Sequence, residues 1–306
     1  MCPHSQSCSP RAEMGANLEV IDLGAGRTAV VVSVGEYHIC ALLDDAIVKC
    51  WGQNIYGQLG LGDTLKRSGN ANVMGTNLPS VDLGPGRTAL AVTAGDRYTC
   101  AVLDDGTLKC WGQNIAGQLG LGDTTDRGGT ANEMGANLPS VDLGAGRTAV
   151  AVCTGGGHTC ALLDDATVKC WGWNNNGQLG LGDTSRRGVN ANEMGANLPS
   201  VDLGAGRTAV AVCTGGGHTC ALLVSDDATV KCWGQNFFGQ LGLGDTANRG
   251  DNANEMGANL PSVDLGAGRT AVAVKVGRQH TCALLDDATV KCWGLNDSGQ
   301  LGLGDT

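Results

Sequence analysis

The chain has 306 residues, of which 50 are glycine, 42% are apolar and 16% are charged. Disordered chains carry more charge and fewer apolar residues, so this composition predicts a folded, turn-rich protein with little helix. A net charge of −10 argues against nucleic acid as a partner, because it repels phosphate backbones, and no apolar run is long enough to predict insertion into a membrane.

A unit of about 60 residues occurs five times and is the strongest signal in the sequence. Cys100, Cys160 and Cys220 lie 60 residues apart, and Cys282 follows 62 residues later because the fourth unit has two extra residues. The predicted domain is one array over residues 14–306, with units at about 14–66, 67–126, 127–186, 187–248 and 249–306. Residues 1–13 are expected to be a disordered tail, and they lack the pattern of a signal peptide.

Each unit contains short strand patterns joined by glycine-rich turns. In the third unit we expect strands at 148–152, 158–163 and 167–171, with a three-residue hairpin loop at 164–166. The segment 137–143 can add a fourth strand at the sheet edge, since Pro139 lacks the N–H that a central strand needs. About four antiparallel strands per repeated unit are typical of a β-propeller blade, so we predict an all-β propeller of five blades.

The hairpin register places two cysteines opposite each other in every unit. With a three-residue loop at 44–46, Leu43 faces Ile47 and Cys40 faces Cys50. Residues opposed in this way are close enough for a disulfide bond. The two residues inserted in the fourth unit lie within the hairpin loop and leave its pair opposed. We therefore predict one disulfide per blade: Cys40–Cys50, Cys100–Cys110, Cys160–Cys170, Cys220–Cys232 and Cys282–Cys292.

Two alternatives for these cysteines stay open. His158 and Cys160 share a strand face beside Cys170, an arrangement compatible with zinc. The spacing is unusual for zinc ligands, however, and the second unit has Tyr98 at the histidine position, so we expect no metal. The other alternative is a set of reduced cysteines that pack as small hydrophobic side chains.

Cys153 and Cys213 lie outside these pairs, at matching positions on the innermost strands of neighbouring units. We expect them to be too far apart for a disulfide bond, and therefore to be free thiols. Ser33, Thr93 and Lys275 occupy the same position in the other units. This set of side chains predicts a central channel of mixed polarity.

The motif at residues 158–183, with His-Thr-Cys-Ala-Leu-Leu-Asp-Asp, Val-Lys-Cys-Trp-Gly and Gly-Gln-Leu-Gly-Leu-Gly-Asp, resembles the regulator of chromosome condensation repeat. The resemblance recurs in all five units and covers most of the chain. It implies blades around a central axis, in a family whose propellers usually have seven. Five units allow a closed small ring, an open arc or a fragment of a seven-bladed ring. A closed ring would require residues 18–22 to complete the fifth blade.

The cysteine-containing form of the motif resembles repeats in predicted extracellular proteins of bacteria and algae. Together with the paired cysteines, this resemblance favours an extracellular or cell-surface location, with the cytoplasm as the alternative.

Known activities of the family carry over unevenly. The founding member is an exchange factor for a small nuclear GTPase and docks on chromatin, but none of its functional residues maps onto this chain. The family's plant photoreceptor uses a Gly-Trp-Arg-His-Thr motif, and the corresponding residues here, as at 35–38 and 155–158, contain no tryptophan. A secreted enzyme inhibitor of this architecture binds its target across one propeller face. We therefore predict a non-catalytic protein-binding scaffold without a cofactor, and the alternative is a regulatory propeller that acts on a small GTPase or inhibits an enzyme.

Positions that repeat in every unit are expected to build the blade, and positions that vary are expected to carry specificity. The histidine at 38, 158, 218 and 280 is predicted to be structural, because no acid or nucleophile accompanies it in one blade alone. The tryptophan of each Cys-Trp-Gly is expected to wedge between blades, namely Trp51, Trp111, Trp171, Trp233 and Trp293. Two variable loops carry aromatic and arginine side chains of the kinds that anchor protein interfaces, and the predicted interface residues are Tyr37, Ile55, Tyr56, Arg97, Trp173, Phe237, Phe238 and Arg278.

Overall fold

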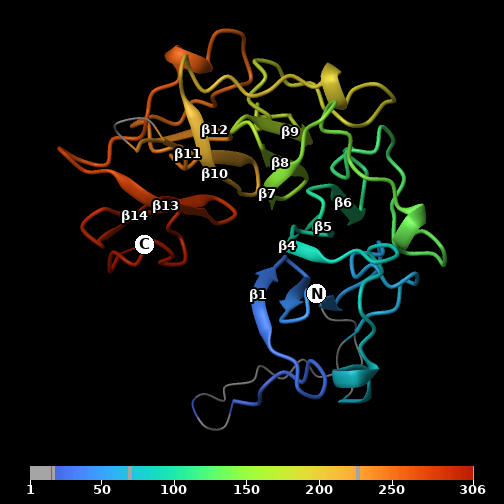
Figure 1. Cartoon of the computed structure of the whole chain (residues 1–306). Coiled ribbons are helices and arrows are strands. Elements are labelled where there is room, and N and C mark those ends of the chain that lie inside the picture. Colours follow the sequence, from blue (N-terminus) through green and yellow to red (C-terminus); the bar gives the residue numbers. More distant parts are fainter. Residues whose placement is uncertain (1–14, 16–17, 68–70, 225–227, 306) are drawn as a thin grey trace.

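The computed structural model describes residues 15, 18–67, 71–224 and 228–305. The tail expected at residues 1–13 lies outside them. Five antiparallel sheets follow one another around a central axis, and each has its three strands in sequence order, with the first strand innermost (Figure 1). The strands are β1 (Ala29–Val34), β2 (His38–Leu43), β3 (Val48–Gly52), β4 (Ala89–Ala94), β5 (Tyr98–Leu103), β6 (Leu108–Gly112), β7 (Ala149–Thr154), β8 (His158–Leu163), β9 (Val168–Gly172), β10 (Thr208–Thr214), β11 (His218–Val224), β12 (Val230–Gly234), β13 (Ala271–Val276), β14 (His280–Leu285) and β15 (Val290–Gly294).

Short 3₁₀ turns lie between the blades in the part of the chain that the structure describes. These are η2 (Ala71–Val73), η3 (Gly75–Asn77), η4 (Gly135–Asn137), η5 (Gly195–Asn197) and η6 (Gly257–Asn259). The all-β blade architecture is therefore as predicted.

Each blade has three strands, whereas the sequence predicted about four. The segment 137–143 begins at the end of η4 and donates the hydrogen bond from Val141 N to Leu108 O in β6 (2.8 Å). Pro139 has no N–H, so the segment cannot build a regular ladder with this strand. A separate antiparallel bridge joins Gly112 to Arg127. The outer edge of the blade is thus covered by irregular chain rather than by a fourth strand.

The hairpin between the second and third strands fixes the position of the disulfide. Ala46 has φ of 61° and Gly106 has φ of 76°, the left-handed conformation that a three-residue hairpin loop needs at this place. Leu43 N donates to Ile47 O, and Cys40 pairs with Cys50 three steps further on. The predicted bonds are confirmed in all five blades, each with a Cα–Cα distance of 4.1 Å: Cys40–Cys50, Cys100–Cys110, Cys160–Cys170, Cys220–Cys232 and Cys282–Cys292.

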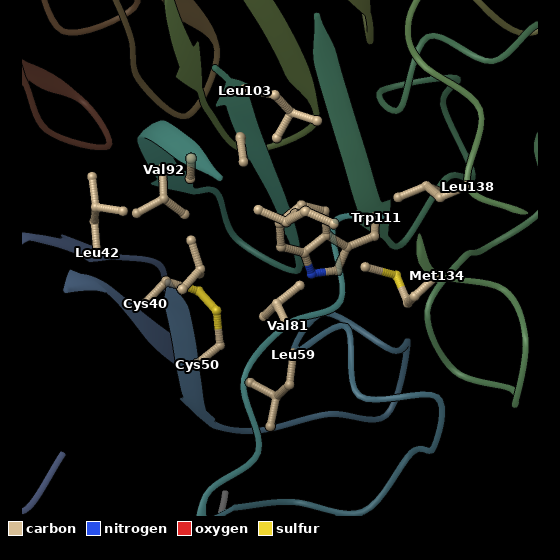
Figure 2. Close-up of a cluster of buried hydrophobic side chains, with 14 residues drawn as sticks. Cys40, Leu42, Cys50, Leu59, Val81, Val92, Leu103, Trp111, Met134 and Leu138 are labelled. Carbon is tan, nitrogen blue, oxygen red and sulfur yellow. A yellow bond between two sulfur atoms is a disulfide. The ribbon is translucent and has the colours of Figure 1, made fainter. Parts of the chain in front are cut away.

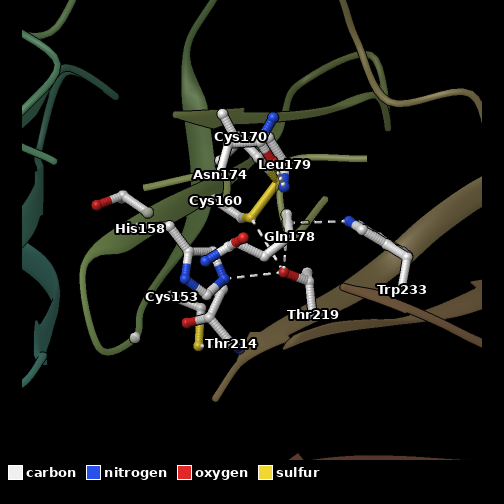
Figure 3. Close-up of a disulfide and its surroundings, with 12 residues drawn as sticks. Cys153, His158, Cys160, Cys170, Asn174, Gln178, Leu179, Thr214, Thr219 and Trp233 are labelled. Atoms are coloured by element: carbon white, nitrogen blue, oxygen red, sulfur yellow. Dashed lines mark hydrogen bonds between the residues drawn. A yellow bond between two sulfur atoms is a disulfide. The ribbon is translucent and has the colours of Figure 1, made fainter. Parts of the chain in front are cut away.

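A buried hydrogen-bond chain crosses each joint between neighbouring blades, and Figure 3 shows the one between the third and fourth. Trp233 Nε1 and Thr219 Oγ1 both donate to the carbonyl oxygen of Gln178, at 3.1 and 2.9 Å. Thr219 Oγ1 also lies 2.9 Å from His158 Nε2. Since the only hydroxyl proton of Thr219 goes to Gln178, the histidine donates from Nε2. The repeated histidine, glutamine and tryptophan therefore hold adjacent blades together.

The hydrophobic core lies at these joints rather than within single blades. Figure 2 shows the cluster between the first two blades, with Trp111 of the second blade near its centre. Trp111, Trp171 and Trp233 are fully buried. A Cβ on Gly60 would lie 2.7 Å from Trp111 Nε1, so glycine is required where the preceding blade meets the indole ring.

The five blades form an open arc whose first and last sheets share no strand (Figure 1). Of the three arrangements considered, the closed ring is not formed, because residues 18–22 do not complete the fifth blade. This segment joins no sheet, and Asp22 O accepts a hydrogen bond from Gly75 N (2.9 Å) beside the first blade. Trp51 and Trp293 are only partly buried, and Val30, Val32 and Val34 of β1 are 56–68% exposed. The two ends of the arc therefore lack the cover that internal blades give each other.

Candidate protein-binding face and central channel

The two variable loops of each blade lie together at one end of the propeller, which we call the loop face. It comprises the residues before each second strand and after each third strand: 35–37 and 53–56, 95–97 and 113–116, 155–157 and 173–176, 215–217 and 235–238, and 277–279 and 295–298. The two loops of a blade are joined by a backbone bond, such as Gln53 N to Tyr37 O (2.9 Å). The hairpin tips with their aspartate pairs lie at the opposite end of the same strands, because β2 runs from one end to the other.

Neighbouring blades are also joined on the loop face, which makes it a continuous surface. Asp96 N donates to Gly155 O at 3.3 Å, and Gly156 N donates to Gly215 O at 3.1 Å. Gly216 N donates to the carbonyl oxygen of Arg278 at 2.9 Å. These bonds follow the rim of the central channel from the second blade to the fifth.

Three of the predicted interface residues meet on the first two blades. The guanidinium of Arg97 lies 5.4 Å from the ring centre of Tyr37 and 5.6 Å from that of Tyr56. This distance is within the range of a cation–π interaction. Tyr37 is 42% exposed, whereas Tyr56 and Arg97 are partly buried. Arg97 thus orders two aromatic side chains from the neighbouring blade into one patch.

A second aromatic–arginine pair lies on the third blade. The guanidinium of Arg186 is 4.0 Å from the ring centre of Trp173. Trp173 was predicted as an interface residue, but Arg186 was not. Its position holds Lys66, Asp126 and Asn248 in other units, so the same variability that marked the loops was available to find it.

The other predicted apolar interface residues are exposed and take no part in these aromatic–arginine contacts. Phe237 and Phe238, on the fourth blade, are 60% and 43% exposed, and Ile55 is 56% exposed. Ile115 of the second blade is likewise 61% exposed, so large apolar side chains occur on the loop face of each of the first four blades. Their spread gives the face a different surface above each blade.

Charged side chains meet at the rim of the channel. Arg278 Nη1 lies 2.7 Å from Glu36 Oε1, which links the fifth blade to the first. Although burial raises the pKa of Glu36, its hydrogen bonds with Tyr37 and Arg278 hold it below the usual value. Burial, together with the charge of Glu36, raises the pKa of Asp96 to about 6.

The innermost strands surround a cavity of about 540 Å³, and the side chains expected in a channel of mixed polarity line it: Ser33, Thr93, Cys153, Cys213 and Lys275. Cys153 and Cys213 are free, as expected. They were predicted to be too far apart to form a disulfide bond, whereas the two thiols are near enough to interact.

The structure excludes the zinc arrangement considered for His158. Cys160 and Cys170 are joined in a disulfide, and His158 Nε2 bonds to Thr219. Burial lowers the pKa of His158 to about 3, so this side chain stays neutral and structural. Within the described part of the chain, no group of three or more histidine, cysteine or acidic side chains is arranged to hold a metal ion. The described residues also contain no helix with the length and apolarity to cross a bilayer.

Comparisons with known proteins agree with this architecture. The "Regulator of chromosome condensation (RCC1) repeat" matches at residues 29–58, 90–118, 149–178, 209–240 and 271–300, and a second form of the repeat matches at 48–102, 105–162, 166–222 and 228–284. The chain is 30% identical to the ultraviolet-B receptor UVR8 of Arabidopsis thaliana over 277 aligned residues, and this alignment covers 90% of the chain. The match spans 55% of the receptor, so the chain corresponds to about half of that relative.

Solved propellers share the fold at low identity. Human WBSCR16 has a TM-score of 0.68 at 20% identity, over 91% of this chain and 65% of that one. Yeast RCC1 (Prp20), solved bound to Kap60, has a TM-score of 0.64 at 20% identity, over 88% of this chain and 56% of that one. With five blades, five matched units and this fold, the chain belongs to the regulator of chromosome condensation (RCC1) repeat family.

Proposed function

We propose that the chain is a non-catalytic protein-binding propeller whose partner docks on the loop face. The observation that carries this proposal is the pair of aromatic–arginine clusters, Arg97 with Tyr37 and Tyr56, and Arg186 with Trp173. Tyrosine, tryptophan and arginine are the side chains in which binding energy concentrates at protein interfaces. Because these side chains are already ordered in the free protein, less conformational entropy is lost when the complex forms.

The contrast between the two ends of the strands supports the choice of face. At the hairpin tips the same ion pair recurs, as between Arg87 and Asp105 and between Arg147 and Asp165. Such solvent-exposed pairs contribute little energy and look alike above every blade. The loop face, unlike the hairpin tips, differs from blade to blade, which a partner needs in order to recognise one orientation of a repetitive arc.

The relatives are consistent with a regulatory or interaction role. The yeast propeller was solved bound to another protein, Kap60, and the plant relative is a receptor. A propeller that regulates a small GTPase or inhibits an enzyme would use the same face and is the alternative. The identity of the captured protein separates the two: a GTPase or an enzyme whose activity changes on binding favours the alternative.

The test compares two triple variants in a photo-crosslinking capture from the native source. Tyr56→Ala, Trp173→Ala and Phe237→Ala together remove the aromatic surface of three blades. The matched control, Asp104→Asn, Asp164→Asn and Asp286→Asn, changes three exposed hairpin tips at the opposite end. We expect the first variant to lose at least 90% of a specifically captured protein and the control to retain it. Equal capture by both variants would refute the assignment of the loop face.

A further inference from the structure

Two thiols lie side by side on the channel wall, between the third and fourth blades. Cys153 in β7 and Cys213 in β10 occupy the same position of neighbouring innermost strands, and both line the cavity of about 540 Å³. Thr214 N, the amide that follows Cys213, donates to Cys153 Sγ at 3.3 Å (Figure 3 shows Cys153 beside Thr214). This bond places the Cys153 sulfur next to the Cys213 backbone. Cys213 Sγ in turn donates to Val274 O at 3.2 Å.

A cationic side chain shares the channel wall with this pair. Lys275 occupies the equivalent position in β13 and lines the same cavity. Its ammonium can offset the negative charge that a second deprotonation adds.

The donor set limits what the pair can bind. The other ten cysteines of the described part are joined in disulfides, and no group of three or more metal-binding side chains occurs there. Structural zinc requires about four ligands, and calcium and magnesium require oxygen donors. Two thiolates suit a soft ion such as Cu(I).

We propose that Cys153 and Cys213 form a two-thiolate binding site for Cu(I) in the central channel. On binding, each S–H bond breaks and its proton passes to solvent, while two S–Cu bonds form. Copper stays in the +1 state, so the step needs no oxidant or reductant. The site lies inside the channel, below the loop face, and does not depend on the protein-binding proposal.

The repeats themselves supply conservative variants. Ser33 and Thr93 stand at the same position in the first two blades, and Ser33 Oγ accepts a hydrogen bond from Ala94 N at 2.9 Å, as Cys153 Sγ does from Thr214 N. Cys153→Ser and Cys213→Thr therefore copy side chains that this fold already accepts. All proteins carry Cys2→Ser and Cys8→Ser, so that the channel pair provides the only thiols.

The experiment titrates each protein with Cu(I) held by bicinchoninate in anaerobic ascorbate. We expect the parent to take up one equivalent, either single variant to bind at least 100-fold more weakly, and the double variant to take up none. Circular dichroism and thermal unfolding check that the variants are folded. Three results would overturn the proposal: no uptake by a parent with two titratable thiols, uptake that persists in the double variant, or a parent in which mass spectrometry finds Cys153 and Cys213 already bridged.

Discussion

The joints between blades and the loop face come from the same repeated sequence, but they differ in burial and in how much their side chains vary from unit to unit. At four joints a tryptophan Nε1 donates to a glutamine carbonyl at 3.0–3.1 Å. On the loop face one position after Trp-Gly-x-Asn holds, in turn, Ile55, Ile115, Asn175, Phe237 and Asp297. Packing demands the same side chain each time, whereas a solvent-facing position does not. Joint residues should therefore control stability, and loop-face residues should control binding.

The largest expected effect on stability comes from a joint tryptophan. Trp171→Ala removes a fully buried side chain and should lower the free energy of unfolding by about 3–5 kcal/mol. Trp293→Ala, at the partly exposed end of the arc, should cost roughly half as much. Urea unfolding of both variants measures the difference. Equal losses would contradict the distinction between internal joints and open ends.

The disulfide within a blade should have the next largest effect. Replacing both Cys160 and Cys170 by serine opens a short hairpin loop and should cost about 3 kcal/mol in the chain-entropy description. The matched control is the same double change at Cys282 and Cys292 in the end blade, which tests whether neighbouring blades alter the cost. Reducing agent should lower the free energy of unfolding of the parent. It should leave unchanged that of a variant in which all ten paired cysteines are replaced by serine. A parent as stable in reducing agent as without it would contradict this role of the disulfides.

Stability should fall as pH falls, because the joint histidines must stay neutral. Burial lowers the pKa of His38 to about 4, of His158 to about 3 and of His218 to about 4. In the unfolded chain these histidines take up protons near pH 6.5, whereas in the folded chain they remain neutral until about pH 4. The free energy of unfolding therefore falls as the pH is lowered from about 6.5 to about 4. Asp96, with its pKa raised to about 6, takes up a proton in the folded state and offsets part of the loss.

His158→Tyr isolates one of these groups, since Tyr98 fills the same position in the second blade and donates from Oη to His158 O at 2.5 Å. Between pH 6 and 4 the variant should lose about 1.4 kcal/mol less per pH unit than the parent. Urea unfolding at a series of pH values gives the two slopes. Parallel slopes would show that His158 is protonated in the folded state.

The smallest stability effect is expected on the loop face. Arg97→Ala removes contacts with Tyr37 and Tyr56 and should cost no more than about 1 kcal/mol, the range of an exposed cation–π interaction. Its effect on binding should exceed its effect on stability, because two aromatic rings lose their fixed orientation. Calorimetry with the captured partner, beside thermal unfolding, compares the two effects. A larger loss in stability than in affinity would assign Arg97 to the fold.

The features that local geometry determines could be predicted from the sequence. A three-residue hairpin loop fixes which residues face each other, so the Cys160–Cys170 register followed from counting along the strands. The fourth strand was not correctly predicted, because a suitable strand sequence at 137–143 does not reveal that its edge makes too few hydrogen bonds for a ladder.

Contacts between blades could not be predicted from the sequence, because they depend on how one unit packs against the next. The lysine before each second cysteine reads as a solvent-exposed charge, yet Lys109 is buried and donates to Leu83 O and Gly135 O at 3.0 and 2.6 Å. Likewise, Arg97 and Tyr56 were separate candidates, and only the arrangement of the first two blades brings them together.

Capture and unfolding measured on the same two proteins test the division between joint and face most directly. Trp293→Ala changes a joint at the end of the arc, and the triple variant of Tyr56, Trp173 and Phe237 changes the loop face. At a temperature where both are folded, we predict that Trp293→Ala retains the partner but unfolds at lower urea, while the triple variant keeps its unfolding midpoint and loses the partner. Loss of both properties in both proteins, or an exchange of the two outcomes, would contradict the account.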